Sequence, residues 1–271
     1  MKISILGCGW LGFPLAKSLV KQGHIVQGSV SREEKMPLLA NEGITPFLIQ
    51  LSPAITGTDV ATFLDADVLV IAIPPRAGKF GDDYHVTQIK SVLDNLQDSR
   101  VQHLIYTSST SVYPESNAVL DEESEVIEAS PLVQVEKLIK DFCKKNSKRY
   151  SILRCAGLMG YERMPAKYFA GKTLQTGQIP VNYIHQDDVV AIIQSVIMNN
   201  WDSLTLNLVT PEHPSRAAVY TKNCEEMGLP LPIFEEPTSP LAFKVISGDK
   251  LLQVTGYTFK FANPLDFIYN A

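Results

Sequence analysis

The 271-residue sequence predicts an α/β fold in which helices cover both faces of a mostly parallel sheet. Strand-like and helix-like segments alternate along the chain as far as Arg154. Several of the strand-like segments are apolar along most of their length, as expected of strands that are covered on both faces. The first of them runs directly into a glycine-rich turn. Together these observations predict a doubly wound parallel sheet, followed by a C-terminal part of different composition.

The expected elements alternate regularly. The strands are expected at Lys2–Leu6, Ile25–Ser29, Pro46–Ile49, Val68–Ile73, Val101–Thr107 and Ser151–Arg154. The helices are expected at Pro14–Gln22, Glu33–Asn41, Asp82–Gln97 and Pro131–Asn146. In the first helix Pro14 falls in the first turn, where a missing N–H costs nothing. The apolar face of that helix is formed by Leu15, Ala16, Leu19 and Val20.

The turn after the first strand has the spacing Gly-x-Gly-x-x-Gly. Gly7 can take the tight turn, Gly9 has no Cβ to keep a phosphate from its backbone, and Gly12 lets the next helix pack closely. The N-terminal end of that helix would direct amide donors at a pyrophosphate. We therefore expect a Rossmann-like dinucleotide site at Gly7, Gly9, Trp10, Leu11 and Gly12. The alternative is an ordinary glycine-rich turn between a strand and a helix.

The end of the second strand indicates which dinucleotide would bind. In this fold an acidic residue there usually binds the ribose 2′-hydroxyl of NAD. This chain instead has Ser29, Ser31 and Arg32, and the first acidic residue is Glu33. The two serine hydroxyls and the guanidinium would accept a 2′-phosphate, so NADP is favoured and NAD stays open. Arg32 is otherwise a solvated residue at the start of the next helix.

Two prolines follow the fourth expected strand. Ile73, Pro74 and Pro75 would stop that strand and leave rigid backbone beside the cofactor. We expect these residues to contact the dinucleotide. The alternative is that the prolines only end the strand.

The composition after Arg154 indicates a second, smaller lobe. Residues 157–180 are rich in glycine and aromatic residues, and residues 211–240 are rich in proline. Between them a strand and a helix are expected over Asn182–Asn199, and a further strand at Leu204–Leu208. We therefore expect a nucleotide-binding domain over 1–156, continued by 182–210, and a small interleaved lobe from 157–181 and 211–271. A ligand would sit in the cleft above the carboxyl ends of the strands.

The bulk properties exclude several classes of protein. The net charge is −5 and the basic residues are dispersed, which argues against nucleic acid as a partner. The four cysteines form no CxxC pair, so we expect free thiols in a reducing compartment and no metal. No apolar stretch approaches the roughly 18 residues that a membrane span needs, and the N-terminus has no leader pattern. A soluble cytoplasmic protein, monomeric or homodimeric and without a membrane partner, is expected.

Several segments resemble those of one family. The chain is similar over nearly its full length to the extended short-chain dehydrogenase/reductases, also called the NAD-dependent epimerase/dehydratase family. The tyrosine-rich and serine-rich segment at the fifth strand resembles the family's motif, and Tyr183–Asp188 resembles its IHxxD element. The segments that carry the resemblance are Gly7–Gly12, Tyr106–Tyr113, Leu153–Gly160, Tyr183–Asp188 and Asn207–Val209.

The resemblance implies an active site with one departure. It places Ser109 where a hydroxyl binds the reacting oxygen, with Thr107 and Ser108 beside the cofactor. Tyr113 would line the pocket or pack beneath the loop. The family's Tyr-x-x-x-Lys pair is missing, because Glu128 and Leu132 stand at its two positions.

Glu128 could replace the missing tyrosine as a base if burial raised its pKa by about 3 units. Glu128 follows Asp121, Glu122, Glu123 and Glu125, however, and such an acidic run is usually a solvated loop. The chain's own Tyr168-x-x-x-Lys172 lies in an irregular region with Gly171, so we interpret that match as a coincidence.

Further candidates lie in the C-terminal part. Arg163 and His185 are candidate substrate residues, although surface charge and a structural ring hydrogen bond are the alternatives. Asp188 is expected to cap the helix that follows it. The sequence thus predicts an NAD(P)-dependent oxidoreductase or epimerase/dehydratase with a nonstandard active site. Its small-molecule substrate would be hydroxylated, and a nucleotide sugar is one candidate. A non-catalytic NADP(H)-binding sensor or scaffold is the alternative.

Overall fold

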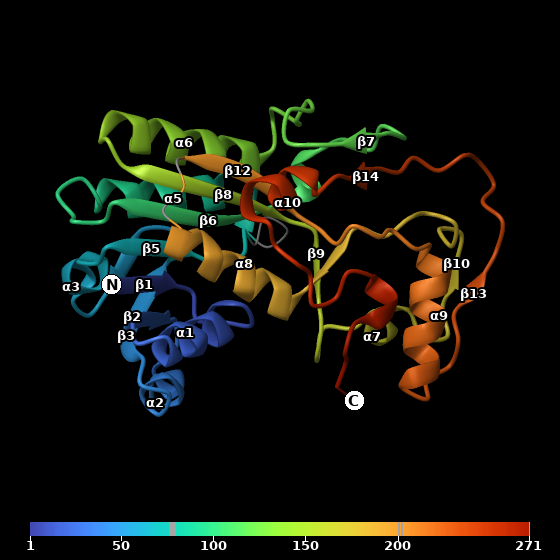
Figure 1. Ribbon diagram of the computed structural model, residues 1–271, viewed down its shortest axis with the longest axis horizontal. Helices are drawn as coiled ribbons and strands as arrows, with labels where there is room; N and C mark the ends of the chain where they lie inside the picture. The colour runs from blue at the N-terminus through green and yellow to red at the C-terminus, as the bar shows by residue number, and fades with distance from the viewer. Residues whose placement is uncertain (76–79, 200, 202, 271) are drawn as a thin grey trace. The chain divides into compact units, whose positions relative to one another are not determined.

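A computed structural model describes residues 1–75, 80–199, 201 and 203–270. Within these ranges one large sheet has the strand order β12-β8-β6-β5-β1-β2-β3-β4 (Figure 1). Its strands are β1 (Lys2–Leu6), β2 (Ile25–Val30), β3 (Thr45–Leu51), β4 (Ile55–Gly57), β5 (Val68–Ile71), β6 (His103–Ser109), β8 (Arg149–Cys155) and β12 (Leu204–Leu208). The neighbours from β6 to β3 run parallel, and β4 pairs antiparallel with β3.

The helices of the first part pack on this sheet as the pattern requires. They are α1 (Gly12–Lys21), α2 (Met36–Ala40), α3 (Val60–Leu64), α5 (Asp83–Asp94) and α6 (Pro131–Lys145). Figure 1 shows α1 on one face and the adjacent α5 and α6 on the other. All four residues of β5 are buried, as are all but the first residue of β1. The predicted doubly wound, Rossmann-like fold is confirmed.

The observed elements differ from the predicted ones in a few places. β5 ends at Ile71 instead of Ile73, and β4 and α3 are additional. α3 begins after Asp59, whose side chain accepts a hydrogen bond from the Thr62 N–H at 3.2 Å. Asp59 was a local signal for a short helix that the spacing of apolar residues does not show.

The chain divides into two compact units. Unit 1 comprises Met1–Val112, Val126–Leu153 and Ile193–Thr205, and unit 2 comprises Tyr113–Glu125, Arg154–Ile192 and Leu206–Ala271. The lobe boundaries given above stay predictions. In the described part of the chain, no helix is both long and apolar enough to cross a membrane.

Unit 2 contains short parallel strand pairs and several helices. The pairs are β9 (Gly157–Met159) with β11 (Tyr183–His185), β10 (Thr173–Leu174) with β13 (Ile233–Phe234), and β7 (Val119–Leu120) with β14 (Val245–Ile246). The helices are α7 (Ala166–Phe169), α8 (Gln186–Asn199, which continues into unit 1), α9 (Arg216–Glu226) and α10 (Asp249–Thr255). Its core includes Val181, Val219 and Tyr220, and the Tyr220 ring stacks on Phe169 with centroids 4.5 Å apart.

α9 lies inside the proline-rich segment 211–240, where no helix was predicted. Ser215 caps it by accepting a hydrogen bond from the Ala218 N–H at 3.2 Å. Ser215 after Pro214 was the local signal for this helix.

Candidate functional site

The three glycines of the first turn differ in what surrounds them. A Cβ on Gly12 would lie 2.2 Å from the Gly7 carbonyl oxygen, which the fold cannot accommodate. Gly7 has φ +102°, and a Cβ there would lie 2.9 Å from the Ala72 carbonyl oxygen. A Cβ on Gly9 would meet no protein atom within 4 Å. Gly7 and Gly12 are therefore required by the packing of the chain, whereas Gly9 keeps open the space in front of the turn.

The turn is fixed to the second strand by Ser29. The Gly7 N–H donates to Ser29 Oγ at 2.8 Å, and the Cys8 N–H donates to the Ser29 carbonyl at 2.8 Å. Ser29 was predicted as one of two serine hydroxyls for a 2′-phosphate, and that role stays a prediction. Its contact with the turn joins residues that are far apart in the sequence, so spacing along the chain did not show it.

The start of α1 suits an anion. The first turn of any helix leaves N–H groups without partners in the helix. The first turn of α1 contains no acidic residue, and no side chain caps it at Leu11. Trp10, Leu11 and Gly12 lead from the turn into this helix, so the amides at its start can be directed at a phosphate.

A pocket of about 670 Å³ adjoins the turn. It brings together Gly7 and Gly9 with the predicted residues Ser31, Arg32, Ile73 and Pro74. Ser29, whose hydroxyl the sequence analysis also considered, lines the pocket as well. The sequence prediction did not include several other residues that line it. These are Leu6, Cys8, Val30, Lys35, Ile49, Gln50, Leu51, Ser52, Ala72, Phe80, Tyr84 and Gln88. They come from the ends of strands β1, β2, β3 and β5, from the segments that follow them and from α5, which sequence spacing alone does not bring together.

Two cationic side chains lie at this pocket. Arg32 Nε is 3.3 Å from Glu34 Oε1, and both side chains are exposed. Lys35 is half-buried and also lines the pocket. An exposed pair such as Arg32–Glu34 is weak, so the guanidinium can exchange Glu34 for a more highly charged anion. Pro75 follows Pro74 and is half-buried.

The three hydroxyl residues at the end of β6 have different partners. Thr107 Oγ1 donates to the Ile71 carbonyl at 3.1 Å, and the buried Ser108 Oγ donates to Glu136 Oε1 at 2.7 Å. The half-exposed Ser109 Oγ accepts from the Ser111 N–H at 3.1 Å. This contact uses an acceptor position of Ser109, so its proton can be donated to a ligand.

Tyr113 is buried and belongs to a polar network of unit 2. Its hydroxyl donates to Asn207 Oδ1 at 2.8 Å and accepts from Arg154 Nη1 at 2.7 Å. Burial raises the pKa of Tyr113. These contacts favour the interpretation that Tyr113 packs beneath the loop.

Glu128 lies in different surroundings from those that a base would need. Its carboxylate is exposed and pairs with Lys137. The burial that would raise its pKa and let it act as a base is therefore missing. Leu132, at the second position of the missing pair, is buried. Of the acidic run, Glu122 is half-buried and accepts from the Asn207 N–H at 2.6 Å. Desolvation raises the pKa of Glu122, so the expectation that the whole run is solvated does not hold for this residue.

The candidate residues of the C-terminal part are mostly tied to structure. His185 is fully buried, and its ring contacts Phe261 and Phe267 with centroids 4.2 Å and 5.3 Å away. Burial lowers its pKa. Arg163 is exposed, and its backbone pairs with Gly160. Asp188 is also buried and accepts from Tyr257 Oη and from the Lys260 and Phe261 N–H groups, so it anchors the C-terminal segment.

The Tyr168-x-x-x-Lys172 match does not place its two side chains on one helix. α7 ends at Phe169, and Gly171 has φ +67° before Lys172. Tyr168 and Lys172 therefore do not share a helical face, in keeping with a coincidental match.

Comparisons with known proteins show the family to which the chain belongs. A family model described as NAD(P)H-binding matches residues 7–200. Protein YeeZ of Escherichia coli K12 is 30% identical over 267 residues, which cover 97% of each chain. The chain therefore belongs to the NAD(P)H-binding family.

Solved structures confirm the fold. A UDP-glucuronic acid 4-epimerase from Bacillus cereus, solved with UDP-glucuronic acid and NAD, matches with a TM-score of 0.80 at 18% identity, over 98% of this chain and 96% of that one. A UDP-glucose-4-epimerase from Stenotrophomonas maltophila, solved with bound NAD, matches with a TM-score of 0.79 at 17% identity, over 98% and 95%. These matches confirm the predicted resemblance to the epimerase/dehydratase family at the level of the fold.

Proposed function

We propose that this protein binds NADP(H) in the pocket at the first glycine turn and catalyses hydride transfer on a small hydroxylated substrate. The observation that carries this proposal is the open space at Gly9, in front of a helix start without acidic residues. The diphosphate would lie over Gly9 and be held by the amides of Leu11 and Gly12 at the start of α1, and a 2′-phosphate by Ser31, Arg32 and Lys35. Arg32 and Lys35 support NADP over NAD.

The bound nicotinamide would supply the hydride chemistry. Ser109 would donate a hydrogen bond to the reacting oxygen and so orient it. Because Glu128 is exposed and Leu132 is apolar, water at Ser109 would move the proton. A nucleotide sugar is the favoured substrate, because the relatives of like fold were solved with such molecules. Arg163 is the proposed cation for its diphosphate.

One test combines binding with turnover. Isothermal titration should give a lower Kd for NADP⁺ than for NAD⁺. With NADPH and a panel of carbonyl compounds and UDP-sugars, turnover should exceed that of Ser109→Ala. A wild-type rate equal to that of Ser109→Ala on every substrate would contradict a catalytic role for Ser109.

A second function is favoured by the missing Tyr-x-x-x-Lys pair. A non-catalytic sensor would bind NADP(H) tightly, transfer no hydride, and change its association with a partner or a second copy when the cofactor binds. Light scattering with and without NADPH would test this, and association that ignores the cofactor would contradict it. The thiols of Cys8, Cys143, Cys155 and Cys224 are buried and form no disulfide bond, which supports the proposed cytoplasmic location for either function.

A further inference from the structure

A stacked pair of aromatic rings forms part of the pocket wall. The Phe80 and Tyr84 rings have centroids 4.4 Å apart and an interplanar angle of 22°. Both side chains line the pocket, and Phe80 is 45% exposed although it is large and apolar. An exposed aromatic ring at the wall of a pocket is typical of a surface that a ligand covers.

Hydrogen bonds hold this pair at the end of β3. Tyr84 Oη donates to the Leu51 carbonyl oxygen at 2.9 Å, and Gln88 Nε2 donates to the same oxygen at 2.8 Å. Both lone pairs of that carbonyl are therefore used. Since Leu51 is the last residue of β3, these two bonds attach the first turns of α5 to the strand end.

A further hydrogen bond fixes the side-chain amide of Gln88. Its amide nitrogen is used at Leu51, so its oxygen accepts from His85 Nδ1 at 3.2 Å. That assignment makes His85 Nε2 an acceptor, and Tyr106 Oη donates to it at 2.9 Å. Burial lowers the pKa of His85, which agrees with a neutral ring. The bonds run in one direction from β6 to the pocket wall, so this wall is rigid before any ligand arrives.

The position in the sheet decides which ring of a dinucleotide this pair would meet. β2 and β3 lie on one side of β1, and β5 and β6 lie on the other. The pocket contains the ends of β2 and β3, where Arg32 and Lys35 are proposed to bind the ribose phosphate. The proposed reacting centre at Ser109 lies at the end of β6. The base beside the 2′-phosphate is adenine, so the adenine ring belongs on the side of Leu51.

We propose that the Phe80–Tyr84 pair is a preorganised platform on which the adenine ring of the dinucleotide stacks. This inference rests on the proposed function, because it needs a dinucleotide in the same pocket. Stacking of a base on an aromatic side chain is tolerant of the base's identity. The pair therefore contributes affinity, and the selection for a 2′-phosphate comes from the cationic residues.

The first test measures affinity. Isothermal titration of Phe80→Leu with the dinucleotide that binds the wild type more tightly, NADP⁺ or NAD⁺, should give a Kd about tenfold higher. Phe80→Tyr keeps the aromatic ring and should stay within about twofold. Tyr84→Phe keeps the ring but loses the bond to Leu51, so its Kd should fall between these two.

The second test detects stacking directly. The fluorescence of 1,N⁶-etheno-AMP should be quenched on binding to the wild type and to Phe80→Tyr, and much less on binding to Phe80→Leu at saturation. Equal Kd and equal quenching in wild type and Phe80→Leu would overturn the platform while leaving the dinucleotide site intact. Failure of the wild type to bind NADP⁺ or NAD⁺ would instead overturn the proposed function and the platform with it.

Discussion

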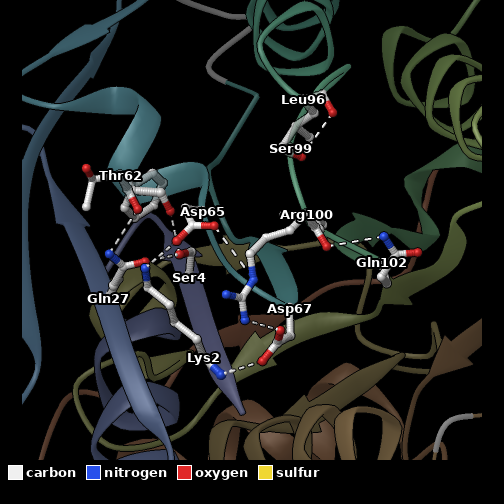
Figure 2. Close-up of polar contacts among 12 residues, drawn as sticks. Lys2, Ser4, Gln27, Thr62, Asp65, Asp67, Leu96, Ser99, Arg100 and Gln102 are labelled. Atoms are coloured by element: carbon white, nitrogen blue, oxygen red, sulfur yellow. Dashed lines mark hydrogen bonds and ion pairs between the residues drawn. The ribbon is translucent and has the colours of Figure 1, made fainter.

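The two ends of the parallel strands in unit 1 use polar groups in opposite ways. At the amino ends, Asp67 accepts from the Lys2 N–H at 2.7 Å and from Arg100 Nη2 at 2.5 Å, and Lys2 Nζ lies 3.0 Å from Asp65 (Figure 2). At the carboxyl ends, Gly7, Gly9 and Arg32 line a pocket. Arg32 also has a carboxylate partner, but its 3.3 Å contact with Glu34 joins two exposed side chains, and such a pair is weak. The difference separates a structural edge from the proposed binding edge in the same sheet.

The largest expected effect is a loss of folding stability, which would also disrupt the proposed binding edge. Gly12→Ala would place a methyl group against the Gly7 carbonyl, at 2.2 Å before any shift. We expect a loss of more than about 3 kcal/mol in the free energy of unfolding. Urea denaturation would measure it. A loss under about 1 kcal/mol would contradict the close approach of helix and strand.

The next effect removes binding and spares the fold. Gly9→Val places its side chain in the open space where the diphosphate would lie, so affinity for NADP⁺ should fall at least about 100-fold. Its free energy of unfolding should stay within about 0.5 kcal/mol of the wild type, because the site is exposed. Titration calorimetry and urea denaturation on the same preparation would check both. Undiminished affinity in Gly9→Val would contradict the site.

A smaller effect concerns which side chains at the proposed binding edge select NADP⁺ over NAD⁺. Arg32→Ala with Lys35→Ala should weaken NADP⁺ about tenfold at low salt and leave NAD⁺ nearly unchanged. The matched control is Glu34→Gln, which frees Arg32 from its carboxylate and should strengthen NADP⁺ binding about twofold. Equal losses of affinity for NADP⁺ and NAD⁺ in the double variant would contradict a role for Arg32 and Lys35 in binding the 2′-phosphate.

The smallest effect belongs to the structural edge and depends on pH. Hydrogen bonds from the Lys2 N–H and from Arg100 lower the pKa of Asp67 below 3.8. A lowered pKa in the folded state means that the ionised carboxylate stabilises above pH 3.8 and that this stability is lost as pH falls below it. Asp67→Asn should therefore cost about 0.5 kcal/mol at pH 7, since Asp67 is partly exposed, and less at pH 3. Urea denaturation at both pH values would measure the difference, and a larger cost at pH 3 would contradict the sign.

The sequence predicted those features that are local in the chain. The Gly7 to Gly12 turn, β1 and α6 follow from spacing and composition over a few residues, and the structure has them close to the expected bounds. The pairing of β9 with β11 joins segments far apart in the sequence, so the irregular composition of 157–180 concealed it.

The candidate site was predicted unevenly for the same reason. Ser31 and Arg32 are found from their position after a strand. Leu51, Tyr84 and Gln88 enter the pocket only because α5 is attached to the end of β3. Gln88 lies on the buried face of α5 with Ile89 and Val92, so the spacing of apolar residues predicts its burial but not its contact with the pocket. Glu128 shows the converse, because the acidic run before it predicted the exposure that the structure shows, whereas its family position did not.

The contact between Gly12 and Gly7 has a mechanical consequence. Only a hydrogen atom fits between the first turn of α1 and the end of β1, so neither element can slide along the other. An arriving nucleotide would meet a receptor whose shape is already set, and would not have to drive a rearrangement to create it. Hydrogen exchange of the backbone amides in β1 and at the start of α1 should therefore already be slow in the free protein. Added ligand should slow the exchange of all these amides to a similar extent.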